Sequence, residues 1–331
     1  MHVGLIGTGR IGALHARTLR ESELVSQLTI VDADARRAAA VARELSAAQA
    51  ESPQALLALG VDALVIAAAT PAHAELLHLA ADASVPAFCE KPIALDLAST
   101  DEVIRHVQRT ETMVQIGFQR RFDVGYRAAR EAHRAGALGE VRVVHLVTHD
   151  PAPPSDAYVA ASGGIWRDLA IHDFDIGAWV LDSRITEVFA AGQAHGRVFA
   201  DNDDVDAACA VLRFENGAVG SLSATRNDAR GYDVRMEIFG LRDSVAVGWD
   251  GRTPLRSIEP GVEAPTLSGY RDFIDRFQPA YRAELDAFLA AVRDRTESAC
   301  TVTEARDALV VALAADCSLR ERRPVRVDEF S

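Results

Sequence analysis

The sequence predicts an α/β protein with two domains, and two observations lead to this fold class. In the first third of the chain, short apolar runs such as Ala63 to Ala69 alternate with helical patterns, which indicates a parallel sheet connected by right-handed crossovers. From Ile185 onward, strand-like stretches follow one another through short turns, as at Glu215-Asn216-Gly217, which indicates a large, mostly antiparallel open sheet. We therefore expect a first domain over residues 1–120 and a second, α+β domain over residues 121–331, whose last helices can pack back on the first domain.

The composition limits the possible classes of function. The chain has 331 residues and a formal net charge of -13, so we expect neither nucleic acid nor an anionic membrane as a partner, because both attract positive surfaces. The four cysteines lie far apart without metal-ligand or disulfide spacing, so we expect no metal and a reducing compartment. No leader-like segment precedes the first apolar run, and no run is long enough to span a bilayer. These features predict a cytoplasmic protein that acts on a small molecule.

The first element is an apolar run, His2 to Ile6, followed by a glycine-rich turn and a helical pattern. Strand, glycine turn and helix in this order are typical of the dinucleotide-binding Rossmann fold. The first glycine permits the tight turn, the second lets a pyrophosphate approach the backbone, and the third lets the helix pack closely on the strand. The helix N-terminus offers N–H groups to the phosphates. The expected cofactor loop comprises Gly7, Gly9, Arg10, Ile11 and Gly12.

A second apolar run, Leu28 to Val31, ends at Asp32, which lies 20 residues after the last glycine of the loop. A carboxylate at this position accepts hydrogen bonds from the adenosine ribose and repels a 2′-phosphate, so NAD is the predicted cofactor. Arg36 and Arg37 follow closely, and they either accept NADP or face water. The strand context and the spacing of Asp32 disfavour a Rossmann-like domain that binds no dinucleotide.

Lys91 is the only lysine among 35 basic residues. Lysine offers a compact ammonium whose pKa can move, which arginine does not. Lys91 follows the apolar run Val85 to Phe88, and sites in open α/β sheets lie just beyond the carboxyl ends of strands. We therefore predict a chemical role for Lys91, and the alternative is a surface lysine retained by chance. Thr70, after the run that begins at Ala63, is expected at the same edge of the sheet, facing the cofactor.

A second candidate site lies in the segment from Ser162 to Trp179. If the segment is one helix, Asp168, His172 and Asp175 recur at i, i+4 and i+7 on one face. An aspartate one turn before a histidine can orient the imidazole and stabilise its protonated form, as a general base for alcohol oxidation requires. The alternative is a solvated Asp-His pair, which is the more common outcome of this spacing by itself.

Several motifs together resemble those of the Gfo/Idh/MocA oxidoreductases, and the likeness runs nearly from end to end of the chain. It is strongest to the inositol-oxidising members of that family. The lysine together with the Asp-x-x-x-His set is far more specific than the glycine loop. The matching stretches are Gly7 to Gly12, Glu90-Lys91-Pro92, Gly117 to Asp123, Asp150 to Pro154, Gly163 to Asp175 and Gly231 to Asp233.

The resemblance implies NAD-dependent oxidation of a cyclic polyol, such as myo-inositol, to a ketone. In that reaction His172 would take the hydroxyl proton, Lys91 would hydrogen-bond the same oxygen, and Asp168 would orient both. Glu90 and Lys91 would also contact the cofactor. The family usually pairs its open sheets, so a homo-oligomer, either a dimer or a tetramer, is implied. The implied substrate-binding residues are Arg121, Asp150, Asp175 and Tyr232.

Two other functions stay open at this point. One is a dehydrogenase of another sugar or anhydrosugar in the same superfamily, or a glycosidase that works through transient oxidation with tightly held NAD. The loops at 151–162 and 195–204 would decide between these substrates. The other is a dinucleotide-sensing regulator without catalysis, which the presence of Lys91, Asp168 and His172 disfavours.

Overall fold

The computed structural model describes residues 1–330, and these form two compact units. The first unit comprises Met1–Gln119 together with Pro279–Arg306. The second comprises Arg120–Gln278 together with the C-terminal segment that begins at Asp307. The first unit therefore takes in a segment from near the end of the chain.

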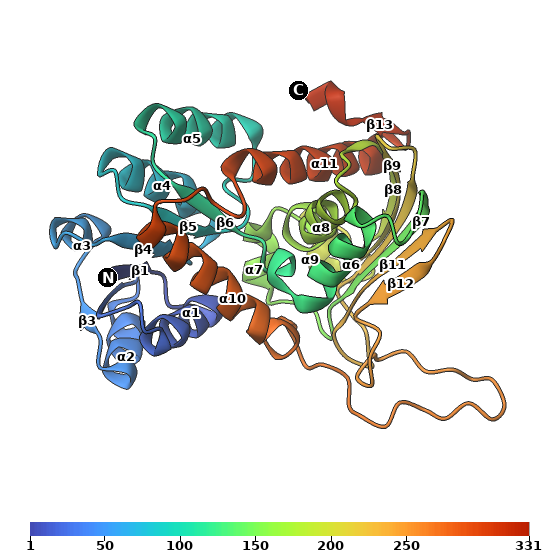
Figure 1. Ribbon diagram of the computed structural model, residues 1–331, viewed down its shortest axis with the longest axis horizontal. Helices are drawn as coiled ribbons and strands as arrows, with labels where there is room; N and C mark the ends of the chain where they lie inside the picture. The colour runs from blue at the N-terminus through green and yellow to red at the C-terminus, as the bar shows by residue number, and fades with distance from the viewer. Residues whose placement is uncertain (331) are drawn as a thin grey trace. The chain divides into compact units, whose positions relative to one another are not determined.

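The first unit is built on a parallel sheet, which has six strands in the described residues, in the order β3-β2-β1-β4-β5-β6 (Figure 1). Its central strands are mostly apolar and, apart from His2, buried, because helices cover both faces. The predicted Rossmann-type sheet is confirmed. The strands are β1 (His2–Ile6), β2 (Gln27–Val31), β3 (Ala48–Gln49), β4 (Ala63–Ile66), β5 (Ala87–Glu90) and β6 (Val114–Gly117).

Two strand boundaries differ from the prediction. β4 ends at Ile66 and does not reach Ala69, whereas β5 begins at Ala87 and runs on to Glu90. Small apolar residues pack in strands and in the loops beyond them, so an apolar run does not locate the last residue of the ladder. As a result, Lys91 directly follows the carboxyl end of β5.

A late helix, α10 (Phe273–Asp294), completes the core of the first unit. Its Leu285, Phe288 and Leu289 are fully buried in one cluster with residues of β1, β2, β4, α1 and α2. In Figure 1, α1, α2 and α10 lie on one side of this sheet and α4 and α5 on the other. The remaining helices are α1 (Arg10–Glu21), α2 (Ala35–Leu45), α3 (Pro53–Ala58), α4 (His73–Asp82) and α5 (Leu97–Thr110), with a 3₁₀ turn at Thr70–Ala72.

The second unit contains a larger sheet, which has seven strands in the described residues, in the order β12-β11-β7-β10-β9-β8-β13. All neighbours pair antiparallel except β7 and β10, which are parallel. The predicted α+β class with a mostly antiparallel sheet is therefore confirmed. The strands are β7 (Val141–His149), β8 (Ile185–Gln193), β9 (Ala207–Phe214), β10 (Val219–Thr225), β11 (Asp233–Gly240), β12 (Ser244–Val247) and β13 (Val325–Arg326).

Helices cover one face of the second sheet and leave the other open (Figure 1). On the covered side, Leu146 of β7 and Phe214 of β9 lie near Gly177 of the central helix α8. The helices of this unit are α6 (Val124–Arg134), α7 (Asp156–Ser162), a π-helical turn at Trp166–Ala170, α8 (Ile171–Leu181), α9 (Arg197–Ala200) and most of α11 (Val302–Glu321), with 3₁₀ turns at Gln119–Phe122 and Val327–Phe330.

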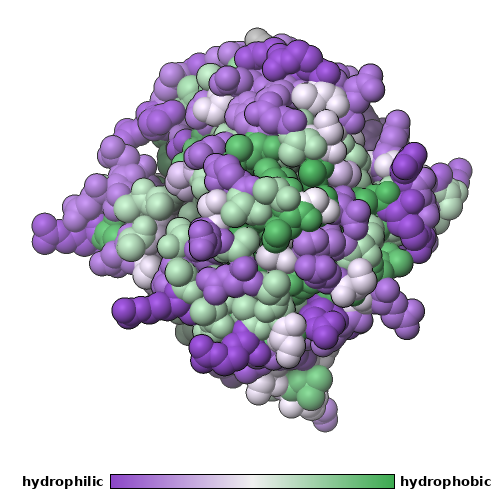
Figure 2. Space-filling model, turned by 90° about the vertical axis from the view of Figure 1, so that its left-hand side faces the viewer, coloured by the Kyte–Doolittle hydropathy of each residue, from purple (hydrophilic) through white to green (hydrophobic). Residues whose placement is uncertain are grey.

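The surface is predominantly polar where Figure 2 shows it. Hydrophilic side chains form most of the margin of this face, and hydrophobic ones gather near its centre. Among the described residues, no helix combines the length and the apolar character that crossing a bilayer would require.

Candidate functional site

The glycine loop at the end of β1 has the backbone geometry of a tight strand-to-helix turn. Gly7 has a φ of +96°, and a Cβ at this position would lie 2.5 Å from the carbonyl oxygen of Ala67. A Cβ at Gly12 would lie 2.1 Å from the carbonyl oxygen of Gly7. Both glycines are therefore required by close backbone packing. A Cβ at Gly9, in contrast, would meet no described atom within 4 Å, so the backbone stays accessible there.

The N-terminus of α1 can receive an anion. Gly9 is its N-cap and has no side chain to satisfy the first N–H groups, and no acidic residue lies in the first turn, which Arg10 and Ile11 open. A helix start of this kind presents unsatisfied donors and a partial positive charge. A dinucleotide pyrophosphate matches both properties.

Asp32, directly after β2, is held by several donors. Its Oδ2 accepts hydrogen bonds from the Thr8 backbone N (2.6 Å), Thr8 Oγ1 (2.7 Å) and Arg37 Nε (3.1 Å). Its Oδ1 accepts from the Asp34 backbone N (2.8 Å) and Arg37 Nη2 (2.7 Å). Partial burial opposes ionisation, but the hydrogen bonds from Arg37, Thr8 and the backbone outweigh it and lower the pKa of Asp32 to about 2.

The two arginines that follow Asp32 differ in their surroundings. The guanidinium of Arg37 is half-exposed and forms an ion pair with the carboxylate of Asp32. Arg36 is exposed. The negative charge of Asp32 is thus partly balanced by Arg37 of the following helix, α2.

The loops after β4 and β5 are connected by a buried histidine. His73, at the start of α4, is 1% exposed. Its Nε2 lies 3.0 Å from the carbonyl oxygen of Ala68 and its Nδ1 lies 2.7 Å from that of Pro92. His73 therefore connects the loop before Thr70 with the loop after Lys91. Sequence reasoning missed it, because a single histidine early in a helix has no distinguishing pattern.

In the second unit, Asp168 and His172 do not share a regular α-helix as the spacing suggested. Asp168 lies in the π-helical turn, and His172 lies in the first turn of α8. A π-turn changes the angular phase of the side chains, so the i, i+4 rule does not transfer across it. Such turns occur frequently at functional sites.

Arg226, which sequence reasoning missed, joins two of the predicted site residues. Its Nη2 donates to Asp168 Oδ2 (2.7 Å) and its Nη1 donates to Asp150 Oδ2 (3.1 Å). The hydroxyl of Tyr158 donates to the other oxygen of Asp168 (2.8 Å). Burial opposes the charge of Arg226, but the carboxylates of Asp168 and Asp150 outweigh it and raise the pKa of Arg226 above its ordinary value. A chain with 34 arginines offers no sequence signal that would single this one out.

Arg121 and Asp175, both predicted to bind substrate, form an ion pair with each other. Arg121 Nη2 lies 2.5 Å from Asp175 Oδ1, and the two side chains are 5% and 1% exposed. The neighbouring pair, Arg120 and Asp173, is equally buried, at 2.6 Å. The two pairs connect α8 to the turn at Gln119–Phe122, and the substrate role of Arg121 and Asp175 stays a prediction.

Tyr232, the last predicted substrate residue, is 5% exposed. Its ring packs edge-on against Phe277, with centroids 6.3 Å apart, and its backbone N donates to the carbonyl oxygen of Tyr270 (2.7 Å). Burial raises the pKa of Tyr232 above its ordinary value, so the phenol stays protonated. Its substrate role also stays a prediction.

Two family models match the chain. Residues 1–118 match a model described as an oxidoreductase family with an NAD-binding Rossmann fold. Residues 126–246 match the C-terminal domain of the GFO/IDH/MocA proteins. The matched parts fall in the two sheets described above.

Named proteins are similar to the chain over nearly its whole length. Myo-inositol dehydrogenase Hyg17 of Streptomyces leeuwenhoekii is 39% identical over 96% of this chain and 97% of its own. Myo-inositol 2-dehydrogenase of Thermotoga maritima is 33% identical over 99% of both chains. The crystal structure of a myo-inositol dehydrogenase from Corynebacterium glutamicum superposes with a TM-score of 0.90 at 29% identity, covering 98% of each chain.

Proposed function

The chain belongs to the GFO/IDH/MocA family of NAD-binding oxidoreductases, and from this premise we propose that it oxidises one secondary alcohol of a cyclic polyol of the myo-inositol type to a ketone. The observation that carries this proposal is the full-length similarity to two myo-inositol dehydrogenases, at 39% and 33% identity. Lys91, Asp168 and His172 supply the chemical groups that the reaction needs.

The cofactor is NAD, and the geometry of the first unit suits it. We assign the pyrophosphate to the start of α1, where Gly9 leaves the backbone accessible and Arg10 and Ile11 follow. We assign the adenosine ribose to Asp32. Thr70 lies in the turn after β4, and Glu90 is the last residue of the neighbouring strand β5, so both lie at the same edge of the sheet. When bound, NAD supplies the acceptor for the hydride that leaves the substrate carbon.

In the proposed reaction, His172 removes the proton of the substrate hydroxyl as a general base. The Lys91 ammonium donates a hydrogen bond to the same oxygen and stabilises the negative charge that develops there. Asp168 orients these two groups. Arg226 and Tyr158 both donate to Asp168, so they favour its charged form and restrict its rotamer.

The remaining hydroxyls of the polyol would meet the polar groups of the second unit. We propose Arg121, Asp150, Asp175 and Tyr232 for this role. Arg226 belongs to the same network because it binds Asp150. The pairs Arg121–Asp175 and Arg226–Asp150 hold these donors and acceptors in fixed positions, which favours a rigid polyol over a flexible chain.

Turnover of the purified chain with NAD tests the proposal directly. The substrates would be myo-inositol, scyllo-inositol and a set of hexoses, and the measurement is the absorbance of reduced nicotinamide. Steady turnover with an inositol and little with hexoses is expected. Turnover with hexoses alone, release of sugar from a glycoside with retained NAD, or no turnover at all would reject it in favour of a sugar dehydrogenase, a glycosidase or a sensor, respectively.

The open face of the second sheet supports self-association. Its half-exposed apolar side chains are Val143, Phe189, Val211, Val219 and Phe239. Apolar patches of this kind mark interaction surfaces, and a sheet face can pair with its own copy around a two-fold axis. We propose a homodimer or tetramer through this face, and a purely monomeric mass in analytical ultracentrifugation would exclude it. The four cysteines are all free in the described chain, which supports a cytoplasmic location.

A further inference from the structure

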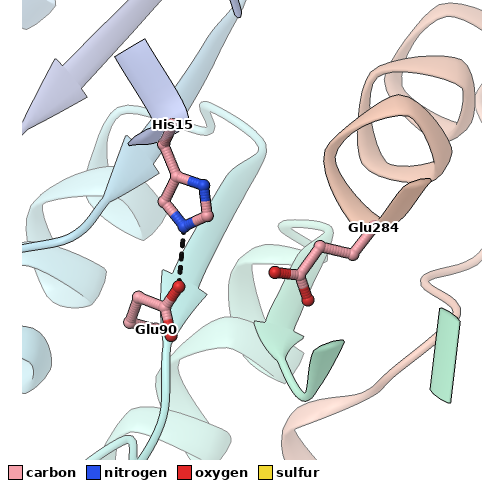
Figure 3. Close-up of side chains that lie close together, drawn as sticks. All are labelled: His15, Glu90 and Glu284. Carbon is pink, nitrogen blue, oxygen red and sulfur yellow. Dashed lines mark hydrogen bonds and ion pairs between the residues drawn. The ribbon is translucent and has the colours of Figure 1, made fainter. Parts of the chain in front are cut away.

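Three buried polar side chains lie close together in the first unit, and the proposed reaction uses neither His15 nor Glu284 among them. We call them the acid cluster: His15 on α1, Glu90 at the end of β5 and Glu284 on α10 (Figure 3). One nitrogen or oxygen atom of each lies within 4.8 Å of the others. His15 Nε2 and Glu90 Oε1 are 2.7 Å apart. Figure 3 shows the carboxyl group of Glu284 pointing from α10 toward Glu90.

Glu284 is unusual because it is buried without a polar partner. Its exposed fraction is 0%, and neither carboxyl oxygen has a hydrogen-bond partner among the described residues. Its backbone carbonyl oxygen accepts a hydrogen bond from Gln115 Nε2 at 2.9 Å. An ionised carboxylate in such a place would lack every donor that buried charges need. Burial raises the pKa of Glu284 well above its ordinary value, and the charge of Glu90 raises it further.

Either a bound proton or a bound cation could neutralise Glu284. The distance of 2.7 Å between His15 Nε2 and Glu90 Oε1 is that of a hydrogen bond. Two ligands of one zinc ion, each about 2.1 Å from the metal at a tetrahedral angle, would be roughly 3.4 Å apart. The imidazole is also enclosed by aromatic rings, with Phe88 at 5.4 Å and Tyr281 at 5.9 Å between centroids. The geometry therefore favours a proton.

We propose that Glu284 holds a proton at neutral pH, so that Glu90 is the only negative charge in the acid cluster and, fixed by His15, sets the position of the strand end that carries Lys91. The cluster connects three elements: α1 with the cofactor loop, β5 with Lys91, and α10. Glu284 is thus a positioning residue that acts through Glu90. Two facing carboxylates would instead repel each other and push β5 and α10 apart.

The titratable groups that face Glu284 define the expected pH dependence. They are Glu90 from β5 and His15 from α1. Tyr281 of α10 packs against His15, and Gln115 of β6, which is uncharged, binds the backbone carbonyl of Glu284. Because the folded state raises the pKa of Glu284, it binds one more proton than the unfolded chain at pH values between the two pKa values. Stability therefore falls as the pH rises through this window, by up to about tenfold per pH unit in the unfolding equilibrium.

Glu284→Gln tests the proposal, because glutamine copies the shape of the neutral acid and cannot ionise. Asp286→Asn on the same helix is the matched control, since it makes the same acid-to-amide change at an exposed position. Unfolding of the full chain by urea is compared between about pH 5.5 and 8.5. We expect Glu284→Gln to gain stability relative to wild type as the pH rises, by up to about tenfold per pH unit, and Asp286→Asn to follow wild type.

Infrared spectroscopy of the wild-type protein gives a second readout that does not depend on a variant folding. At neutral pH, we expect the carbonyl stretch of one buried protonated carboxyl, present in Asp286→Asn and absent in Glu284→Gln. Absence of this band in wild type would overturn the proposal. A chelator that lowers the melting temperature of wild type but not of Glu284→Gln would also overturn it, in favour of a bound cation.

Catalysis supplies a readout that separates positioning from mere packing. The alkaline limb of the pH profile of kcat/KM should extend to higher pH in Glu284→Gln, because its side chain stays neutral there. Equal alkaline limbs in the two proteins would overturn the link to Lys91. The infrared and urea measurements need no substrate, so they remain informative even if the proposed polyol is wrong.

Discussion

Glu284 in the first unit and the paired acids of the second unit are held in opposite ways. In the second unit, the buried Asp173 and Asp175 and the partly buried Asp168 each form an ion pair with an arginine. Neither carboxyl oxygen of Glu284 in the first unit has a hydrogen-bond partner among the described residues. A guanidinium favours the charged form of a neighbouring carboxylate, although burial still raises the pKa of Asp173 above its ordinary value. A buried carboxylate without a cation is neutralised by a proton. The difference corresponds to the two proposals above, which place charged acids around the polyol and a protonated Glu284 beside Glu90.

The largest effect is expected at the two residues that are proposed to act on the reacting oxygen. Lys91→Ala and His172→Ala should each lower kcat by at least about 1,000-fold, because one removes the donor to the reacting oxygen and the other removes the base. NAD binding, followed by fluorescence titration, should be retained. Rates near wild type in either variant would refute the assigned roles.

The buried pairs of the second unit provide the next test. Arg120→Met should lower the free energy of unfolding by about 3–5 kcal/mol, because it leaves the fully buried Asp173 without its cation. The double variant Arg120→Met/Asp173→Leu should recover most of this loss, since no orphan charge remains. Urea denaturation measures both, and equal losses in the single and double variants would show that packing matters more than charge.

Arg226 tests whether the charge of Asp168 depends on its partner. Arg226→Met should lower kcat/KM by about 100-fold, because Asp168 and Asp150 lose the cation between them, and Arg226→Lys should recover part of the activity. Arg184→Met is a suitable control, since Arg184 forms an exposed pair with Glu215. If both methionine variants behaved alike, the Arg226 network would have no special role.

The smallest effect is expected at the half-exposed pair of the first unit. Asp32→Ala should reduce the preference for NAD over NADP by about tenfold, and Arg37→Ala should increase it by roughly threefold, because the carboxylate then repels a 2′-phosphate without a counter-charge. Initial rates with both cofactors give the ratio. With a pKa of about 2, Asp32 stays ionised at neutral and alkaline pH. A ratio that changes with pH above about pH 7.5, where the 2′-phosphate of NADP is also fully ionised, would argue against this role.

Much of the fold was predictable from local patterns. Apolar runs separated by amphipathic helices indicated the parallel sheet, and Glu215-Asn216-Gly217 indicated the turn between β9 and β10. The parallel pairing of β7 with β10 was not predictable, because these strands are about 70 residues apart in the chain and their partner is chosen by packing rather than by a turn.

The residues of the candidate site also divide into those that the sequence could identify and those that it could not. Lys91 stood out because it is the only lysine, and Asp32 because of its distance from the glycine loop. Arg226, His73 and Glu284 carried no such signal, since arginines are abundant in this chain and isolated polar residues in helices are common. Each of these residues approaches a group far away in the chain: His73 lies beside Pro92, 19 positions on, Arg226 binds Asp150, 76 positions back, and Glu284 lies near His15, 269 positions back.

The sequence by itself determined the two kinds of sheet, the cofactor loop and the family, because each of these depends on residue types at short, regular spacing. Only the tertiary structure decided which buried acids keep their charge. The protonation and orientation of a carboxylate depend on the donors and charges that surround it in space, and folding brings those groups together from distant parts of the chain.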